Sequence, residues 1–136
     1  MIKYLLCFSI LILIFSNACK KIDSSIWIDP QIEANFVGTF KEIASDTIYG
    51  TVSLLISDGY YNCFTNMPYG HGAGKLAVDE TTIDFNDTLF FPMLTMYAAS
   101  FVLSGKYYYS FNGKNLKIRE INTVYDIEYN LDLIAN

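Results

Sequence analysis

Histidine is almost absent from this chain, in which His71 is the only one among 136 residues. Cysteine is also scarce, with three residues in total. A zinc site takes three or four histidine, cysteine or carboxylate ligands, so this composition excludes a histidine-based zinc cluster. A Ser–His–Asp triad would have to use His71, and no G-x-S-x-G motif is present to carry the serine. We therefore predict no metal site and no catalytic residues, and we expect that the protein is not an enzyme.

Positive charge is also in short supply, because nine Lys and Arg residues stand against 14 Asp and Glu residues, and the formal net charge is −5. The acidic residues are scattered along the chain and form no long run. A mildly acidic domain is a poor partner for nucleic acid or for an anionic lipid surface. The charge therefore argues against binding to either of them.

A glycine-rich stretch from Tyr69 to Lys75 is the segment closest to a nucleotide-binding motif. It is not a P-loop, because Tyr69 takes the place of the first glycine and Leu76 the place of the Ser or Thr after the lysine. It is not a dinucleotide fingerprint either, because its third glycine comes one residue early. Glycines two residues apart in a β protein usually mark a bulged strand start or a close approach of two backbones. We predict that role here, and no cofactor.

The first 18 residues have the features of a secretory signal peptide. Lys3 supplies a basic start, residues 4–15 carry no charge, and residues 16–18 are small or polar. These features occur in this order in signal peptides. The uncharged run is also shorter than the roughly 20 residues that a transmembrane helix needs. We therefore expect residues 1–18 to be removed from the mature protein.

Cys19 follows directly on these residues. The run Ser-Asn-Ala-Cys at positions 16–19 resembles a lipobox, the signal for diacylation of the cysteine and for cleavage before it. Cleavage by an ordinary signal peptidase is the alternative, because that enzyme reads small residues at the same places. Two or more acyl chains anchor a protein stably where one does not. We predict a lipidated Cys19, a tether over residues 19–34, and a location in the cell envelope, on the periplasmic face or the cell surface, with the outer membrane favoured.

The remaining cysteines predict no disulfide. Cys7 leaves with the signal peptide, and Cys63 is then alone beside the lipidated residue. A bridge between Cys19 and Cys63 stays open only if Cys19 is not lipidated. Cys63 lies among aromatic residues, and we interpret it as a small buried hydrophobic residue rather than a catalytic thiol.

From Asn35 onward, apolar residues recur with the period of two that is typical of half-buried strands, and we predict one all-β domain over residues 35–136. Asp58-Gly59 and Asn112-Gly113 are hairpin turn signals. About eight strands follow one another through short turns, so we expect an antiparallel meander that closes into a small barrel, with a β-sandwich as the alternative. The early strands are expected at residues 35–44, 48–57, 60–65, 75–79 and 82–85. In the tether, Trp27 and Ile28 are expected to dock onto the domain.

The faces of the late strands follow from the same alternation. Side chains of one parity point to one face of a strand, and a slip of one residue would invert them all. The acidic residues Asp126 and Glu128, together with Tyr108, are therefore expected in solvent. The opposite face is expected to be buried, and its members are Phe101, Leu103, Tyr107, Tyr109 and Phe111, followed by Tyr125, Ile127, Tyr129, Leu131 and Leu133.

Several short motifs resemble those of small Bacteroidota lipoproteins whose mature part is a lipocalin-like β domain. They are Gly38-Thr39-Phe40, Gly72-Ala73-Gly74-Lys75, Thr82-Ile83-Asp84-Phe85, the run from Leu103 to Tyr109 and the run from Gly113 to Ile118. Lipocalins carry Gly-x-Trp in the first strand, often covered by an arginine from a late strand. The resemblance implies a lipocalin-like barrel in which Phe40 stands in the place of the tryptophan and Arg119 could cover it.

Two functions are compatible with such a domain. In the first, the barrel binds a small apolar ligand, and unusually apolar loops form its mouth. The candidate mouth residues are Met67, Tyr69, Phe90, Phe91 and Met93. In the second, the core is filled and the protein has a structural or interaction role with another component of the cell envelope. A cavity of more than about 300 Å³ would favour the ligand.

Overall fold

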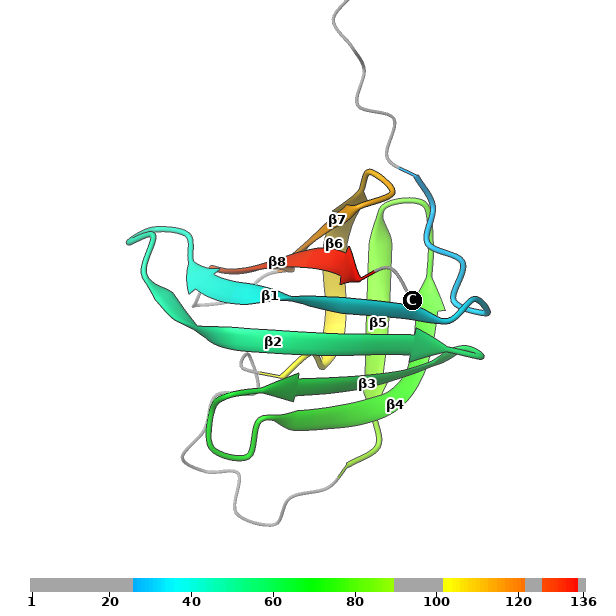
Figure 1. The fold of residues 1–136 in the computed structure, drawn as a ribbon, viewed down its shortest axis with the longest axis horizontal. Coiled ribbons are helices and arrows are strands. Elements are labelled where there is room, and N and C mark those ends of the chain that lie inside the picture. Colours follow the sequence, from blue (N-terminus) through cyan, green and yellow to red (C-terminus); the bar gives the residue numbers. More distant parts are fainter. Residues whose placement is uncertain (1–25, 90–101, 122–125, 135–136) are drawn as a thin grey trace, which may run out of the picture.

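The computed structural model describes residues 26–89, 102–121 and 126–134, so the predicted signal peptide and Cys19 lie outside the described residues. The described part is an eight-stranded antiparallel barrel (Figure 1). Each strand pairs with the next one, and β1 also pairs with β8, which closes the sheet and rules out the sandwich. The strands are β1 (Ala34–Glu42), β2 (Ile48–Ser57), β3 (Tyr60–Thr65), β4 (His71–Val78), β5 (Thr82–Asp87), β6 (Gly105–Phe111), β7 (Asn115–Glu120) and β8 (Ile127–Ile134).

The all-β meander predicted from the sequence is confirmed, but β1, β4 and β5 have other bounds than expected, and β5 continues to Asp87 rather than ending at residue 85. β1 ends at Glu42 rather than at residue 44, because its register shifts after Phe40 and the chain then turns. β4 begins at His71, so residues 71–75 of the glycine-rich stretch lie inside the strand, and Tyr69 and Gly70 precede it. The close backbone approach predicted for these glycines is confirmed at Gly74, where a side-chain methyl group would overlap the backbone oxygen of Asn86.

Turn chemistry fixes the hairpins where the sequence indicated them. Asp58 and Gly59 both have positive φ, 53° and 76°. A two-residue turn of this kind matches the right-handed twist of the strands that it joins. At the second turn Gly113 has a φ of 89°. The side chain of Asn112 accepts hydrogen bonds there from the backbone N–H groups of Lys114 and Asn115 (3.0 and 2.7 Å).

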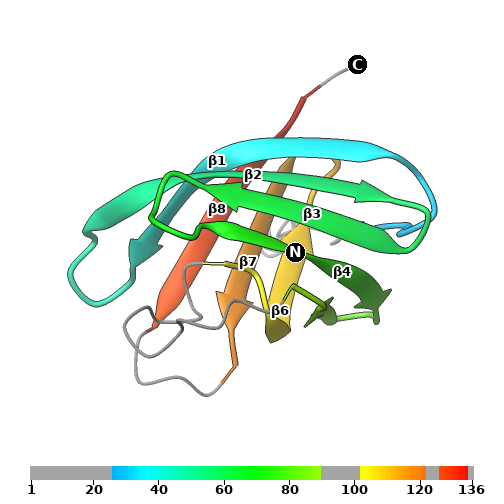
Figure 2. The same ribbon diagram turned by 90° about the horizontal axis from the view of Figure 1, so that it is seen from below.

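The barrel has two walls, one of β1–β3 and the other of β6–β8, and β6 runs steeply across β1–β3 (Figures 1 and 2). Aromatic side chains fill the space between them. Phe85 packs edge-on against Tyr61 and Tyr107, at centroid distances of 4.9 and 5.6 Å. Phe40 stacks on Tyr129 at 5.5 Å. The six buried aromatic rings share the core with eleven buried aliphatic side chains and Cys63.

The predicted faces of the late strands are confirmed where the structure describes them. Tyr107 is 0% exposed and its neighbour Tyr108 is 53% exposed. Tyr109 and Phe111 have the buried parity but are only half-buried, and they lie beyond Tyr108, the last residue of β6 that pairs with β5. In β8, Ile127, Tyr129 and Leu131 are buried, Leu133 is half-buried, and Asp126 and Glu128 are partly exposed. Phe101 and Tyr125 lie outside the described residues.

Connections alternate between the two ends of an antiparallel meander, so each end gathers its own set. The end that carries the turns at residues 58–59, 79–81 and 112–114 also carries residues 26–32, and we name it the tether end. The opposite end carries residues 43–47 and 66–70 and the chain at Leu89 and Val102, and we name it the loop end.

Candidate functional site

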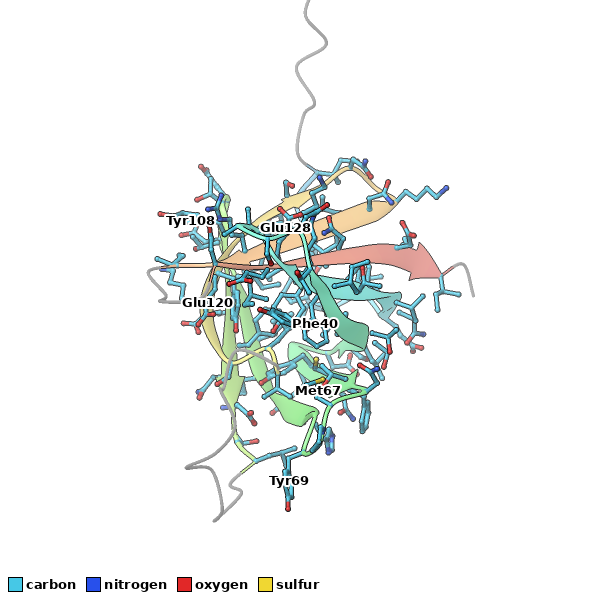
Figure 3. All side chains as sticks on the ribbon, turned by 90° about the vertical axis from the view of Figure 1, so that its left-hand side faces the viewer. Phe40, Met67, Tyr69, Tyr108, Glu120 and Glu128 are labelled. Atoms are coloured by element: carbon cyan, nitrogen blue, oxygen red, sulfur yellow. The ribbon has the colours of Figure 1, made fainter. Side chains whose placement is uncertain are left out.

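The predicted ligand mouth lies at the loop end, and the structure places only part of it. Met67 packs against the core cluster, whereas Tyr69 is exposed and points away from the barrel (Figure 3). The turn that separates them is closed by a hydrogen bond from the Gly70 N–H to the Met67 carbonyl (3.0 Å). Phe90, Phe91 and Met93 lie outside the described residues. The described members therefore do not converge on one opening.

Leu103 occupies the interior at the loop end. Its side chain is fully buried, and its carbonyl accepts a hydrogen bond from the hydroxyl of Tyr61 (2.8 Å). The adjacent residue, Ser104, exchanges two hydrogen bonds with the hydroxyl of Tyr107, which accepts from its N–H (3.2 Å) and donates to its carbonyl (3.1 Å). These hydrogen bonds join the segment before β6 to Tyr61 of β3 and to Tyr107 of β6. Leu103 closes this end from within.

Ile28 closes the tether end in the same way. It is buried and belongs to the core cluster. Hydrogen bonds hold the chain on both sides of it, one from the Ile26 N–H to the Phe111 carbonyl (2.7 Å) and one from the Gly59 N–H to the Pro30 carbonyl (2.8 Å). The expected docking of the tether is therefore correct for Ile28 and wrong for Trp27, which remains mostly exposed.

The packing inside the barrel bears on the predicted choice between a ligand and a filled core. A cavity of ligand size leaves accessible surface on the side chains that line it, and ligand sites usually measure about 300–1,000 Å³. Many large side chains of the interior have at most 2% of their surface accessible. They are Tyr107, Tyr129, Phe36, Phe40 and Phe85, together with smaller aliphatic residues. The described interior is therefore packed with the protein's own side chains.

Cys63 lies in this interior and is fully buried, which confirms the interpretation of a small buried hydrophobic residue. Burial raises the pKa of its thiol to about 11. The thiolate is the nucleophilic form of cysteine, so near neutral pH this side chain is an inert thiol. Within residues 26–89, 102–121 and 126–134, no group of three His, Cys, Asp or Glu side chains is placed to hold a metal ion.

Glu120 is a carboxylate that the sequence analysis missed. It shares the inward parity of Leu116 and Ile118 in β7, and its backbone pairs with Tyr107. Its Oε2 atom is buried and has no hydrogen-bond partner. Loss of solvent raises the pKa of the Glu120 carboxyl above its usual value. The signal in the sequence is that Glu120 has the same parity as Leu116 and Ile118, which places its side chain on the inward face of β7.

The outer surface of the β1–β3 wall carries a groove of about 290 Å³. Its lining contains no charged side chain and consists of Asn35, Phe36, Val37, Ser53, Leu54, Leu55, Asn62, Phe64 and Ile134. Val37, Leu55, Phe64 and Ile134 are exposed apolar residues. Phe64 is held in place by the ring of His71, which stacks on it at 4.2 Å and bonds to Asn62 through Nε2 (2.8 Å). His71 therefore supports the wall of this groove.

The outer surface of the β6–β8 wall differs, because half of the residues that line its shallow depression are charged, namely Lys117, Arg119 and Glu128. Arg119 makes a two-pronged ion pair with Asp126 (3.0 and 2.6 Å) and is half exposed. The resemblance implied that Arg119 could cover Phe40. That expectation is wrong, because Arg119 has the outward parity of β7, and Phe40 stacks on Tyr129 instead.

Searches against protein-family models, curated proteins and solved structures found no match to this chain. The assignment of a function therefore depends on the geometry alone.

Proposed function

We propose that this protein is a lipid-anchored interaction module of the cell envelope, without enzymatic activity, whose filled barrel offers the groove on the β1–β3 wall to another envelope protein. The proposal rests on the position of the apolar residues that lie outside the packed interior. Four of them, Val37, Leu55, Phe64 and Ile134, line one uncharged groove on the outside. Apolar surface gathered in this way usually marks an interaction site.

The first of the two functions considered above, a carrier of a small apolar ligand, is less well supported. Carriers of this kind hold the ligand inside the barrel, and the described interior is packed with aromatic rings. Ile28 and Leu103 also fill the two ends. A ligand would have to displace these side chains, and each buried residue of their size contributes about 1.5–3 kcal/mol by its burial.

The chemistry of the groove indicates which kind of partner would bind there. The chain has a net charge of −5, but the lining of the groove is neutral and mixes apolar side chains with the amides of Asn35 and Asn62. A charged partner segment would lose its hydration here without gaining an ion pair. We therefore propose an uncharged, apolar segment of a protein as the occupant. The lipid on Cys19 would hold the module at the membrane, where such partners reside.

Site-specific photo-crosslinking in membranes tests this proposal. A photoreactive residue at position 55 is expected to give one adduct of defined mass, and Val37→Asp in the same chain should abolish it. The matched control places the same group at exposed Lys117 on the opposite wall. An adduct at position 55 no stronger than at position 117, or unaffected by Val37→Asp, would refute the groove as a docking site.

Extraction of the purified protein with organic solvent, followed by mass spectrometry, separates the two functions. The filled barrel predicts that no lipid or metabolite is recovered in proportion to the protein, apart from the acyl chains on Cys19. A stoichiometric apolar compound would instead favour the carrier.

A further inference from the structure

The tether end of the barrel carries exposed apolar residues in addition to Ile28, the buried residue that closes it. Ile26, Trp27 and Ile32 are all exposed, although they flank the buried Ile28. Trp27 is 53% exposed and is the only tryptophan of the chain. A tryptophan left in water beside a residue that reaches the core is costly, because its large ring could bury far more apolar area.

The backbone of this segment crosses the end of the barrel. It is held at Ile26 by the β6–β7 hairpin and at Pro30 by the β2–β3 hairpin, and Ile28 enters the core between these two points. The segment is visible in blue in Figure 1, beside the start of β1. Its exposed side chains therefore belong to the outer surface of the tether end and not to either wall.

The position of Cys19 sets how far this surface can be from the membrane. Trp27 follows Cys19 by 8 residues (27 − 19). A fully extended chain spans at most about 3.3–3.6 Å per residue, so the two residues are at most about 29 Å apart. Acyl chains on Cys19 start at the boundary between headgroups and hydrocarbon. The tether end is therefore the end of the barrel that is nearest to the bilayer.

We infer that the tether end rests on the bilayer surface with Trp27 in the interfacial layer, an inference that depends on the proposed lipidation of Cys19. Tryptophan is enriched at this depth because its ring is apolar and its N–H remains hydrated. The tether end thus has a lipid surface as its partner, whereas the groove on the β1–β3 wall stays open to a protein.

The charges at this end restrict the lipid that fits. Exposed Lys114 and the exposed acidic residues Asp58, Asp79 and Glu80 lie in the turns of the tether end. The three acidic residues repel anionic headgroups, while Lys20, Lys21 and Lys114 attract them, at about 1 kcal/mol for each basic residue close to the surface. These effects oppose each other. Contact therefore depends on the lipid anchor and on Trp27, and it takes place on a zwitterionic surface.

Quenching of Trp27 fluorescence tests this arrangement, since no other tryptophan contributes to the emission. The full-length protein, processed in a bacterium, is reconstituted into phosphatidylcholine vesicles with or without bromine atoms on the upper part of the acyl chains. Roughly half or more of the emission should be lost to the bromine, as expected for an interfacial ring. The emission maximum should also lie at shorter wavelength than in the Cys19→Ala protein.

A matched control moves the reporter to the other end. The variant with Trp27→Phe and Tyr69→Trp places the single tryptophan at a position that is 55% exposed, close to the 53% of Trp27, but at the loop end. Its emission should be the same in both vesicles. If the protein floats with the vesicles and Trp27 is not quenched, or the reporter at position 69 is quenched equally, the inference is overturned and the anchor stands. If the protein does not float, the lipid anchor fails and the inference fails with it.

Discussion

Replacement of Tyr107 by alanine tests the assigned strand faces most directly. Tyr107 and Tyr108 are neighbours of the same type in β6, but the first is 0% exposed and the second 53% exposed. The two substitutions remove the same atoms from the same strand. Intrinsic strand preference therefore contributes equally to both variants, and the difference between their free energies of unfolding reports on burial.

The expected magnitudes follow from the packing. The ring of Tyr107 packs edge-on against Phe85 at 5.6 Å and against Tyr129 at 6.2 Å. Truncation of a buried aromatic residue costs about 3–5 kcal/mol, out of the roughly 5–15 kcal/mol that stabilises a domain. An exposed residue usually costs under about 0.5 kcal/mol. Tyr107→Phe should fall between them, at about 1–3 kcal/mol, because the backbone groups of Ser104 lose their partner.

Urea unfolding of the unlipidated mature chain, followed by far-UV circular dichroism, measures all three variants. Tyr107→Ala should unfold at a much lower urea concentration or fail to fold, whereas Tyr108→Ala should match the wild-type midpoint. Equal slopes of the transitions would show that stability changed rather than the unfolded state. If Tyr108→Ala proved the least stable of the three, the register of β6 would be wrong, and the residues that line the barrel would belong to the opposite face.

Three further predictions concern the anchor, a glycine and the buried carboxylate. Cys19→Ala should release the protein from membranes or leave it uncleaved, as fractionation and mass determination would reveal; unchanged maturation and membrane association would contradict lipidation. Gly74→Ala should cost about 1–3 kcal/mol in urea unfolding through overlap with the backbone of β5, whereas Gly72→Ala, whose methyl group would come no closer than 3.3 Å to its neighbours, should cost much less. Burial raises the pKa of the Glu120 carboxyl in the folded chain. The protonated carboxyl therefore contributes to stability below the unfolded pKa of about 4.3, and this contribution is lost as the pH rises through the folded pKa. Glu120→Gln should therefore gain stability over the wild type between pH 4 and pH 7, and a pH-independent difference would count against a buried carboxylate.

The closed meander and its faces were predictable because both depend on local signals. Alternation assigned Tyr107, Tyr129 and Leu131 to the interior without knowledge of which strands pair. The positive φ angles at Asp58 and Gly59 follow from the preference of glycine and aspartate for such turns. Each signal involves residues within one strand or one turn, so tertiary structure had little opportunity to override it.

The two ends of the barrel were predicted only in part. Trp27 was expected to dock onto the domain but is exposed, whereas Ile28 and Leu103 are buried as expected. Their burial depends on hydrogen bonds to distant residues, such as Tyr61 for Leu103, 42 positions away. Arg119 failed as a cover for Phe40 for a related reason, because the resemblance suggested a contact but the parity of β7 decided where the side chain points.

The groove on the β1–β3 wall was missed because alternation was used only to find the interior. In an antiparallel sheet with one solvated face, outward positions are usually polar. Val37, Leu55 and Phe64 break that rule on three successive strands, and their register brings them to one place on the wall. Their burial would stabilise the barrel only if something covered them. These exposed apolar residues are the surface that the proposed protein partner would cover.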